Sequence, residues 1–362
     1  MDLPRNKADV AKHWHVPSLD GVRGVALLIV MFAHTAPQVF PGGNIGVDLF
    51  FVLSGFLITT ILLAEFSKTG SISICSFYMK RALRLLPALF LMVALVIAYA
   101  ALFTPVELPA ALGDVPSVVF YFYNWHRVAA WGKTDLFFGF GHLWSLSVEE
   151  QFYILWPLLL LVTLRSRLLF GLVLAVGITA PACARVLLWE EGPALQLYFR
   201  TDLRLDSLMW GATAAWLNLR WNFPRSLSAI PLFALIFFVV LARYNLLSSG
   251  VLYLGGYSVV CFLASIVLIA TAQNLSPWLT RILEFSPLCF TGRISYGLYL
   301  WHVPVFGMLP HSHSVLANAT AIALTFAIAT CSYYGVEKWF LSRKERWSIN
   351  AGAVGANAMP QQ

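Results

Sequence analysis

Long apolar stretches, each followed by a short polar segment, run along almost the whole sequence. An apolar stretch of about 18 or more residues is typical of a helix that crosses a membrane. Ten candidate stretches are present, at residues 19–37, 46–64, 85–104, 142–164, 168–188, 203–219, 228–243, 250–272, 288–309 and 315–336. The pattern therefore predicts an all-α polytopic membrane protein with about ten transmembrane helices.

Basic residues are distributed unevenly between the segments that join these stretches. If the N-terminus is cytoplasmic, most of the 24 Lys and Arg residues fall in inner segments. Cytoplasmic loops of membrane proteins carry such an excess of positive charge, so we expect both termini to be cytoplasmic. Residues 115–125 are apolar but too short to cross a membrane. We expect them to lie at the outer interface or to re-enter the membrane.

The apolar stretches predict one continuous domain. We expect a cytoplasmic N-terminal segment over residues 1–17, a transmembrane domain over residues 18–340 and a disordered cytoplasmic tail over residues 341–362. Neither terminal segment resembles a soluble catalytic domain. Any chemistry is therefore expected to take place among the helices.

The composition supports a membrane protein and excludes several other classes. The chain is 59% hydrophobic and 11% charged, whereas soluble proteins carry about 25% charged residues. This excludes a disordered chain and argues against a soluble enzyme. The five cysteines are scattered singly, which indicates neither a zinc site nor a disulfide framework. The positive-inside pattern already explains the net charge of +7, so no nucleic-acid partner is expected.

Ionisable residues inside the first stretch are the first functional candidates, because such groups are costly in a membrane. Arg23 and His34 are eleven residues apart, which places them on one helix face about 16 Å apart along the axis. The alternative is an arginine that reaches the interface and a histidine bonded to a neighbouring helix.

The second stretch returns after a short turn and brings Asp48 to roughly the depth of His34. A carboxylate beside an imidazole fixes its tautomer and raises its basicity. Asp48 can instead be a helix cap that faces water. Ser54 and Gly55 follow, and we interpret them as a close-packing surface rather than as a nucleophile.

Further polar residues cluster in or beside four other predicted helices. Arg81 and Arg84 share a face at a helix start, where they can bind an anion or anchor the helix to lipid headgroups. His142, Ser145 and Glu149 also share one helix face. Ser147 and Glu150 fit a capping box, which would give Glu150 a structural role. The opposed charges Arg200, Asp202, Arg204 and Asp206 can simply pair with one another. Ser295, Tyr299 and His302 lie on one stripe, which indicates a wet cavity.

The segments that carry these residues match, in order, those of a known family. They are Arg23 followed by His34, and residues 46–57, 77–87, 142–153, 204–211 and 292–302. From about residue 18 to 340, the chain resembles the membrane acyltransferase-3 family of integral-membrane O-acyltransferases. Each segment alone is a weak signal, but six segments in order are highly specific.

The resemblance implies an enzyme of the bacterial inner membrane. Such an enzyme moves an acyl group, often acetyl, from cytoplasmic acyl-CoA to a hydroxyl of a cell-envelope or exported glycan. His34 would be the general base, and Glu149 or Asp48 would orient it. A short-lived acyl-histidine is a variant that the sequence does not separate from direct transfer.

The resemblance also assigns the remaining polar residues. Arg81 and Arg84, with Arg23 and Arg293, would hold the phosphates of coenzyme A, and no metal is expected. The candidate acceptor-binding residues are His142, Ser145, Arg204, Asp206, Tyr299 and His302. Members of the family often carry an additional secreted domain. The last apolar stretch ends near residue 336, and we expect no such domain after it. We therefore expect this chain to act alone or to pass its product to a separate extracytoplasmic partner protein.

A transporter or glycan flippase is the main alternative, with intramembrane Asp, Glu and His residues relaying protons. Transporters often show repeats between their two halves. Residues 19–180 and 203–336 share no repeated motif, which favours the enzyme. A non-catalytic scaffold would leave the arginines and histidines without a role.

Overall fold

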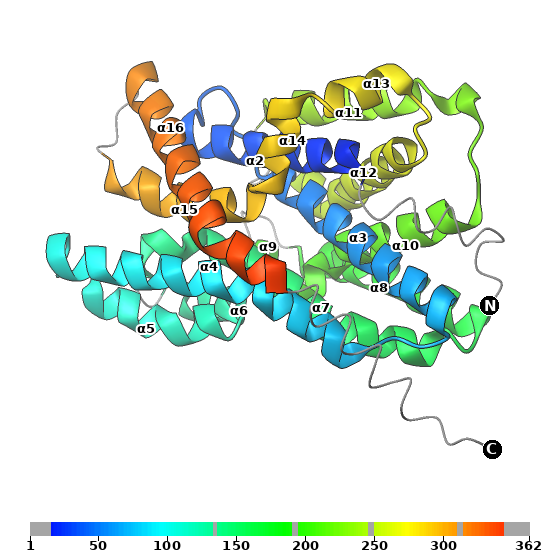
Figure 1. Ribbon diagram of the computed structural model, residues 1–362, viewed down its shortest axis with the longest axis horizontal. Helices are drawn as coiled ribbons and strands as arrows, with labels where there is room; N and C mark the ends of the chain where they lie inside the picture. The colour runs from blue at the N-terminus through cyan, green and yellow to red at the C-terminus, as the bar shows by residue number, and fades with distance from the viewer. Residues whose placement is uncertain (1–15, 133–135, 190–194, 245–249, 310–313, 344–362) are drawn as a thin grey trace.

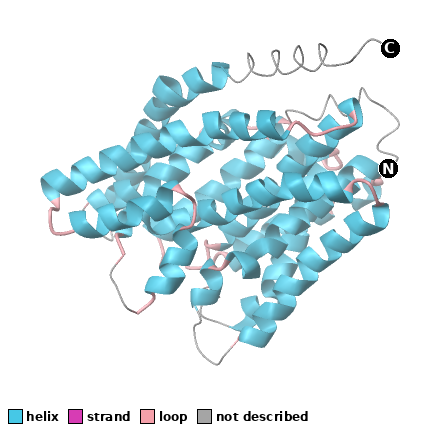
Figure 2. Cartoon of the chain, turned by 90° about the horizontal axis from the view of Figure 1, so that it is seen from below, coloured by secondary structure: helices cyan, strands magenta, loops and turns pink. Residues whose placement is uncertain are grey.

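The computed structural model describes residues 16–132, 136–189, 195–244, 250–309 and 314–343. Every regular element in these ranges is a helix, as Figures 1 and 2 show. The all-α prediction is therefore confirmed for this part of the chain. Most of the predicted terminal segments, residues 1–15 and 344–362, lie outside the described ranges.

The helices follow one another with short connections. In chain order they are α2 (Pro17–Thr35), α3 (Ile45–Thr69), α4 (Ile74–Phe103), α5 (Leu108–Val119), α6 (Tyr123–Ala130), η1 (Phe138–Leu143), α7 (Trp144–Thr163), α8 (Arg167–Leu188), α9 (Leu195–Phe199), α10 (Thr201–Arg220), η2 (Arg225–Leu227), α11 (Ile230–Leu241), η3 (Leu252–Gly256), α12 (Tyr257–Ala272), α13 (Pro277–Leu283), α14 (Ser286–Arg293), α15 (Ser295–Met308), α16 (Val315–Ser332) and η4 (Tyr333–Glu337).

Each of the ten predicted stretches coincides with one of these helices or with two consecutive ones. Seven helical segments of the described chain are long and apolar enough to cross a membrane. The helices of the other three stretches are not both long and apolar enough: α10 is too polar, α11 is too short, and α14 and α15 are separated at Ile294. The chain is an integral membrane protein, and the count of about ten crossings stays a prediction.

Residues 115–125, the apolar segment that is too short to cross a membrane, include the end of α5 and the start of α6. α5 ends at Val119, Tyr121 adopts a positive φ of 56°, and α6 follows. The 12 residues of α5 rise by about 18 Å, which is less than the ~30 Å hydrocarbon core of a bilayer. α5 therefore does not cross the membrane by itself, as its sequence length indicates.

Two apolar clusters form the core, and both include α2 and α3. The larger cluster contains Leu27 and Phe51 with Trp156 of α7. The smaller contains Val22 and Leu53 with residues of α11 and α12. α2 and α3, which carry the first polar candidates, are thus held on two sides by packed apolar side chains.

Glycines allow two helix pairs to approach backbone to backbone, and Figure 1 shows α3 beside α10 and α14 beside α2. A Cβ atom on Gly55 would lie 1.9 Å from the Leu208 carbonyl oxygen, and one on Gly211 would lie 2.0 Å from that of Val52. A Cβ on Gly292 would lie 1.8 Å from the Asp20 oxygen. The predicted close-packing role of the Ser54–Gly55 pair is therefore confirmed for Gly55.

Substitution of Gly55 by alanine is expected to destabilise the protein by about 1–3 kcal/mol or more, because the new methyl group forces α3 and α10 apart. Gly171→Ala is the matched control, since a Cβ there has no neighbour within 4 Å and alanine favours a helix. Thermal unfolding of both variants in detergent measures the difference. Equal melting temperatures would show that the contact between α3 and α10 tolerates a methyl group.

Candidate active site

Three histidines from distant parts of the sequence meet inside the helix bundle. They are His34 at the end of α2, His142 in η1 and His302 in α15. The ring centroid of His302 lies 5.0 Å from that of His34 and 5.0 Å from that of His142. His142 and His302 are buried, whereas His34 is exposed. Of the three, His34 is therefore the one that a substrate reaches most easily.

Each of these rings has one nitrogen bonded to a backbone carbonyl. His34 Nδ1 donates to Val30 (2.9 Å), His142 Nε2 to Leu300 (3.2 Å) and His302 Nδ1 to Tyr299 (2.6 Å). A carbonyl oxygen only accepts, so the bonded nitrogen carries the proton and the other nitrogen of a neutral ring is an acceptor.

These acceptor nitrogens have few partners. His142 Nδ1 and His302 Nε2 are buried without a hydrogen bond among the described residues. A buried polar atom without a partner is costly. The cluster is therefore suited to receive a hydrogen-bond donor such as a hydroxyl group.

Ser145 and Tyr299 join the histidine cluster to α7. Their hydroxyl oxygens are 2.5 Å apart, and the Tyr299 hydroxyl also donates to the His142 carbonyl oxygen at 3.0 Å. The Tyr299 ring lies 5.1 Å from that of His302. The predicted helix faces of α7 and α15 thus face each other.

Glu149 lies one turn further along α7 and connects this cluster to the arginines. Its carboxylate accepts hydrogen bonds from Ser54 (3.0 Å) and Tyr153 (3.3 Å). It is close enough to interact electrostatically with Arg23, Arg81 and the Tyr299 hydroxyl. Glu149 is therefore a negative group placed between two clusters of predicted site residues.

Three arginines form the second cluster, which comprises Arg23 on α2 and Arg81 and Arg84 on α4. The Arg81 guanidinium lies 3.8 Å above the Tyr153 ring, and its Nε is buried without a hydrogen bond. Arg23 pairs with Asp20 at 3.1 Å. The charge of Arg84 interacts with those of Arg23 and Arg81. Among the described residues, Arg81 and Arg84 form no ion pair, so their charges are available to an anionic ligand.

The fourth predicted arginine, Arg293, lies apart. It is exposed at the end of α14. Its neighbour Gly292 packs against the Asp20 carbonyl, so Arg293 lies at the same end of α2 as Arg23. No described hydrogen bond or ion pair joins it to the other arginines.

The remaining predicted residues form a separate buried network. Arg204 pairs with Asp48, and both side chains are fully buried. Asp206 instead pairs with Arg185 through two bonds, at 2.8 and 2.5 Å. The Arg204 guanidinium also lies 4.0 Å above the Tyr257 ring. The two ion pairs join α3, α8 and α10.

This network corrects three expectations. Asp48 lies against Arg204 rather than His34, because the close contact between α3 and α10 turns it away from the imidazole. The charges at the start of α10 do not all pair among themselves: Arg200 pairs with Asp202, but Arg204 and Asp206 bond to other helices. The carbonyl of Val30, rather than Glu149 or Asp48, holds the His34 ring.

The predicted capping box is also wrong. Ser147 lies inside α7, where its hydroxyl donates to the Leu143 carbonyl and accepts from the Tyr123 amide. The helix begins three residues earlier, at Trp144, because η1 leads directly into it. Glu150 therefore does not serve as a cap, and its charge interacts with that of Arg81.

Sequence reasoning missed Arg185 and Tyr153. Arg185 lies within an apolar stretch, which is the same signal that identifies Arg23 as a candidate. Tyr153 follows Glu149 by four residues and therefore shares its helix face. Among the described residues, no group of three or more His, Cys, Asp or Glu side chains is placed to hold a metal ion.

The fold and these clusters define a helical membrane protein with a line of charged and imidazole groups inside its bundle. Residues 16–336 match the acyltransferase domain model of the acyltransferase-3 family. The chain therefore belongs to this family of acyltransferases, as the sequence motifs indicate.

Similar proteins are known from several bacteria. The peptidoglycan O-acetyltransferase OatA of Listeria monocytogenes is 32% identical over 347 residues, which cover 89% of this chain and 55% of that protein. A putative O-acetyltransferase of Staphylococcus aureus strain COL is 34% identical over 95% of this chain and 60% of its own length. The putative peptidoglycan O-acetyltransferase YrhL of Bacillus subtilis is 34% identical over 90% and 55%.

The chain thus spans a little over half the length of these relatives. No solved structure matches the chain.

Removing the charge of Asp48 is expected to destabilise the protein by about 3–5 kcal/mol, because Arg204 is then buried as an unpaired cation. Asp48→Asn is compared with Asp202→Asn, whose ion pair with Arg200 is exposed and contributes about 0–1 kcal/mol. Thermal unfolding in detergent measures both. The same melting temperature in the two variants would contradict a structural role for the buried pair.

Proposed function

We propose that the protein is a membrane O-acetyltransferase that moves an acetyl group from acyl-CoA to a hydroxyl of a cell-envelope glycan. The observation that supports this most is the line of polar groups from the arginine cluster, through Glu149 and Tyr299, to the three histidines. One end of this line suits an anionic donor, and the other suits a hydroxyl group.

His34 is the general base of this proposal. Its Nε2 accepts the proton of the acceptor hydroxyl while the hydroxyl oxygen attacks the thioester carbonyl carbon. The carbon–sulfur bond then breaks, the acetyl group stays on the acceptor oxygen, and the sulfur takes the proton from His34. The bond from Nδ1 to Val30 supports this role, because it fixes the tautomer in which Nε2 is free.

Arg23, Arg81 and Arg84 hold the phosphates of coenzyme A. Each phosphate is an acceptor that guanidinium groups bind through charge-assisted hydrogen bonds. The exposed position of Arg293 at the same end of α2 allows it to add to this attraction. Glu149 compensates part of the positive charge and keeps the arginines in place without the donor.

The acceptor is a sugar of peptidoglycan or of a related envelope polymer. The names of the relatives from Listeria and Bacillus support this class of acceptor. Ser145, Tyr299 and the buried nitrogens of His142 and His302 provide acceptors and donors for its hydroxyl groups. The protein then works in the bacterial cytoplasmic membrane.

Substitution of His34 by alanine is expected to lower acetyl transfer by about 10²–10⁴-fold, because no base takes the acceptor proton. The variant should fold normally, since the ring is exposed. Radiolabelled acetyl-CoA, the purified protein and peptidoglycan fragments provide the assay. His126→Ala is the control, because His126 of α6 lies outside the cluster and bonds to Asp114. Full activity of the His34 variant would exclude His34 as the base.

The double substitution Arg81→Ala and Arg84→Ala is expected to weaken coenzyme A binding by about tenfold or more, since each charged hydrogen bond contributes ~1.5–3 kcal/mol. Titration calorimetry with coenzyme A measures the affinity. Arg165→Ala with Arg225→Ala is the control, as these residues lie on other connections of the chain. An unchanged dissociation constant in the test variant would place the donor elsewhere.

A further inference from the structure

An apolar groove opens on the other side of α7, between α7, α8 and α10. It has a volume of about 830 Å³, within the range of about 300–1,000 Å³ typical of small-molecule sites. Phe152, Trp156 and Met209 form its buried floor, and Leu155, Leu172 and Val176 form exposed walls. None of these six residues belongs to the proposed active site.

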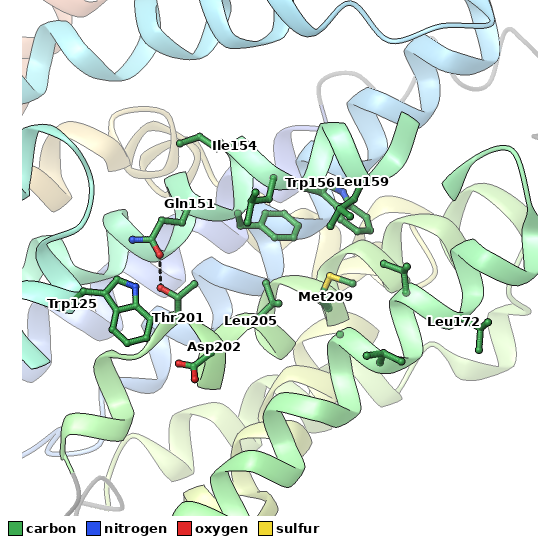
Figure 3. Close-up of a pocket in the computed structure, with 15 residues that line it drawn as sticks. Trp125, Gln151, Ile154, Trp156, Leu159, Leu172, Thr201, Asp202, Leu205 and Met209 are labelled. Carbon is green, nitrogen blue, oxygen red and sulfur yellow. Dashed lines mark hydrogen bonds between the residues drawn. The ribbon is translucent and has the colours of Figure 1, made fainter. Parts of the chain in front are cut away.

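Polar groups gather at one end of this groove, as Figure 3 shows. Trp125, Gln151, Thr201 and Asp202 lie together there, while the other end is lined by apolar side chains. The Thr201 hydroxyl donates to the Gln151 side chain at 2.6 Å. The groove is therefore amphipathic along its length.

The surroundings of the groove indicate a hydrocarbon occupant. The buried residues of α8 are Phe170, Leu174, Pro181 and Arg185, so most of this long apolar helix is available to face the bilayer. Water in the apolar part would find few hydrogen-bond partners. A hydrocarbon chain fills such a space without that cost, and it comes from the adjacent lipid.

Asp202 gives the polar end a negative charge, and its ion-pair partner Arg200 lies beside the groove rather than in its lining. Asp202 pairs with Arg200 at 2.5 Å, and their side chains are 49% and 29% exposed. Because both groups remain accessible, they can also bind a ligand that carries an ammonium group and a phosphate. Such a headgroup is complementary to the pair: its ammonium reaches Asp202 and its phosphate reaches Arg200.

We propose that this groove is a binding site for phosphatidylethanolamine, with one acyl chain between α7, α8 and α10 and the headgroup at Asp202 and Arg200. Trp125 lies at the headgroup level, where tryptophan is common in membrane proteins. The bound lipid then fills the groove between α7 and α8, beside the direct contact of α8 with α10. This site is independent of the proposed acetyl transfer.

The chain-binding part is tested by filling the groove. Val176→Trp places a large side chain on an exposed wall, so it does not disturb the core. We expect the purified full chain to retain one phosphatidylethanolamine in native mass spectrometry, and the variant to retain about tenfold less. Leu155→Trp fills the groove from α7 and gives a second variant. Leu95→Trp, on an exposed face of α4, is the control and should retain the lipid.

The headgroup part is tested with Asp202→Asn. Wild-type protein should prefer phosphatidylethanolamine over phosphatidylglycerol by about two- to fivefold, because exposed ion pairs contribute modestly. The variant should retain lipid but lose this preference. Glu107→Gln, an exposed carboxylate at the start of α5, is the control.

Two results would overturn the proposal. Equal lipid retention in both tryptophan variants and in wild type would show that the groove holds no chain. Equal binding of the two phospholipids by wild type, or displacement of both by a polyprenyl phosphate at lower concentration, would show that the headgroup assignment is wrong.

Discussion

A charged side chain inside a membrane protein needs a partner, because the surrounding hydrocarbon cannot solvate it. This constraint organises the whole bundle. Asp48, Arg185, Arg204 and Asp206 satisfy it by ion pairing, since each has an oppositely charged partner and all four are buried. These groups are neutralised by one another and hold α3, α8 and α10 in register. We therefore interpret them as a structural network, and the acceptor-binding role expected of Arg204 and Asp206 stays a prediction.

The second group of charges satisfies the same constraint only in part. Arg23, Arg81 and Arg84 interact with the carboxylates Asp20, Glu149 and Glu150, but Arg23–Asp20 is the one ion pair that they form among the described residues. The aromatic face of Tyr153 stabilises one guanidinium group without neutralising it. Guanidinium groups that are not held in ion pairs remain available to bind an anion and to release it again, as a donor that turns over requires. Incomplete pairing thus separates the proposed site from the structural network.

The sequence predicted which residues lie in the site better than it predicted which side chains they contact. Periodicity placed Arg23 and His34 on one face, and His142, Ser145 and Glu149 on another, and the structure brings these faces together. The partner of Asp48 was not predictable in this way, because depth along a helix says nothing about which neighbour lies beside it.

Lateral contacts depend instead on where backbones can approach each other. Gly55 and Gly211 bring α3 against α10, and this contact directs Asp48 to Arg204. The number of membrane crossings is also not determined by the apolar pattern alone, because α10 is polar and the α14–α15 segment is broken.

On α7, helix periodicity and lateral packing together determine which residues lie on which face. Residues 145, 149 and 153 face the polar interior, whereas residues 151, 155 and 159 line the lipid-facing groove. One helix therefore separates the proposed chemistry from the bilayer, with polar residues on both of its faces at similar depth.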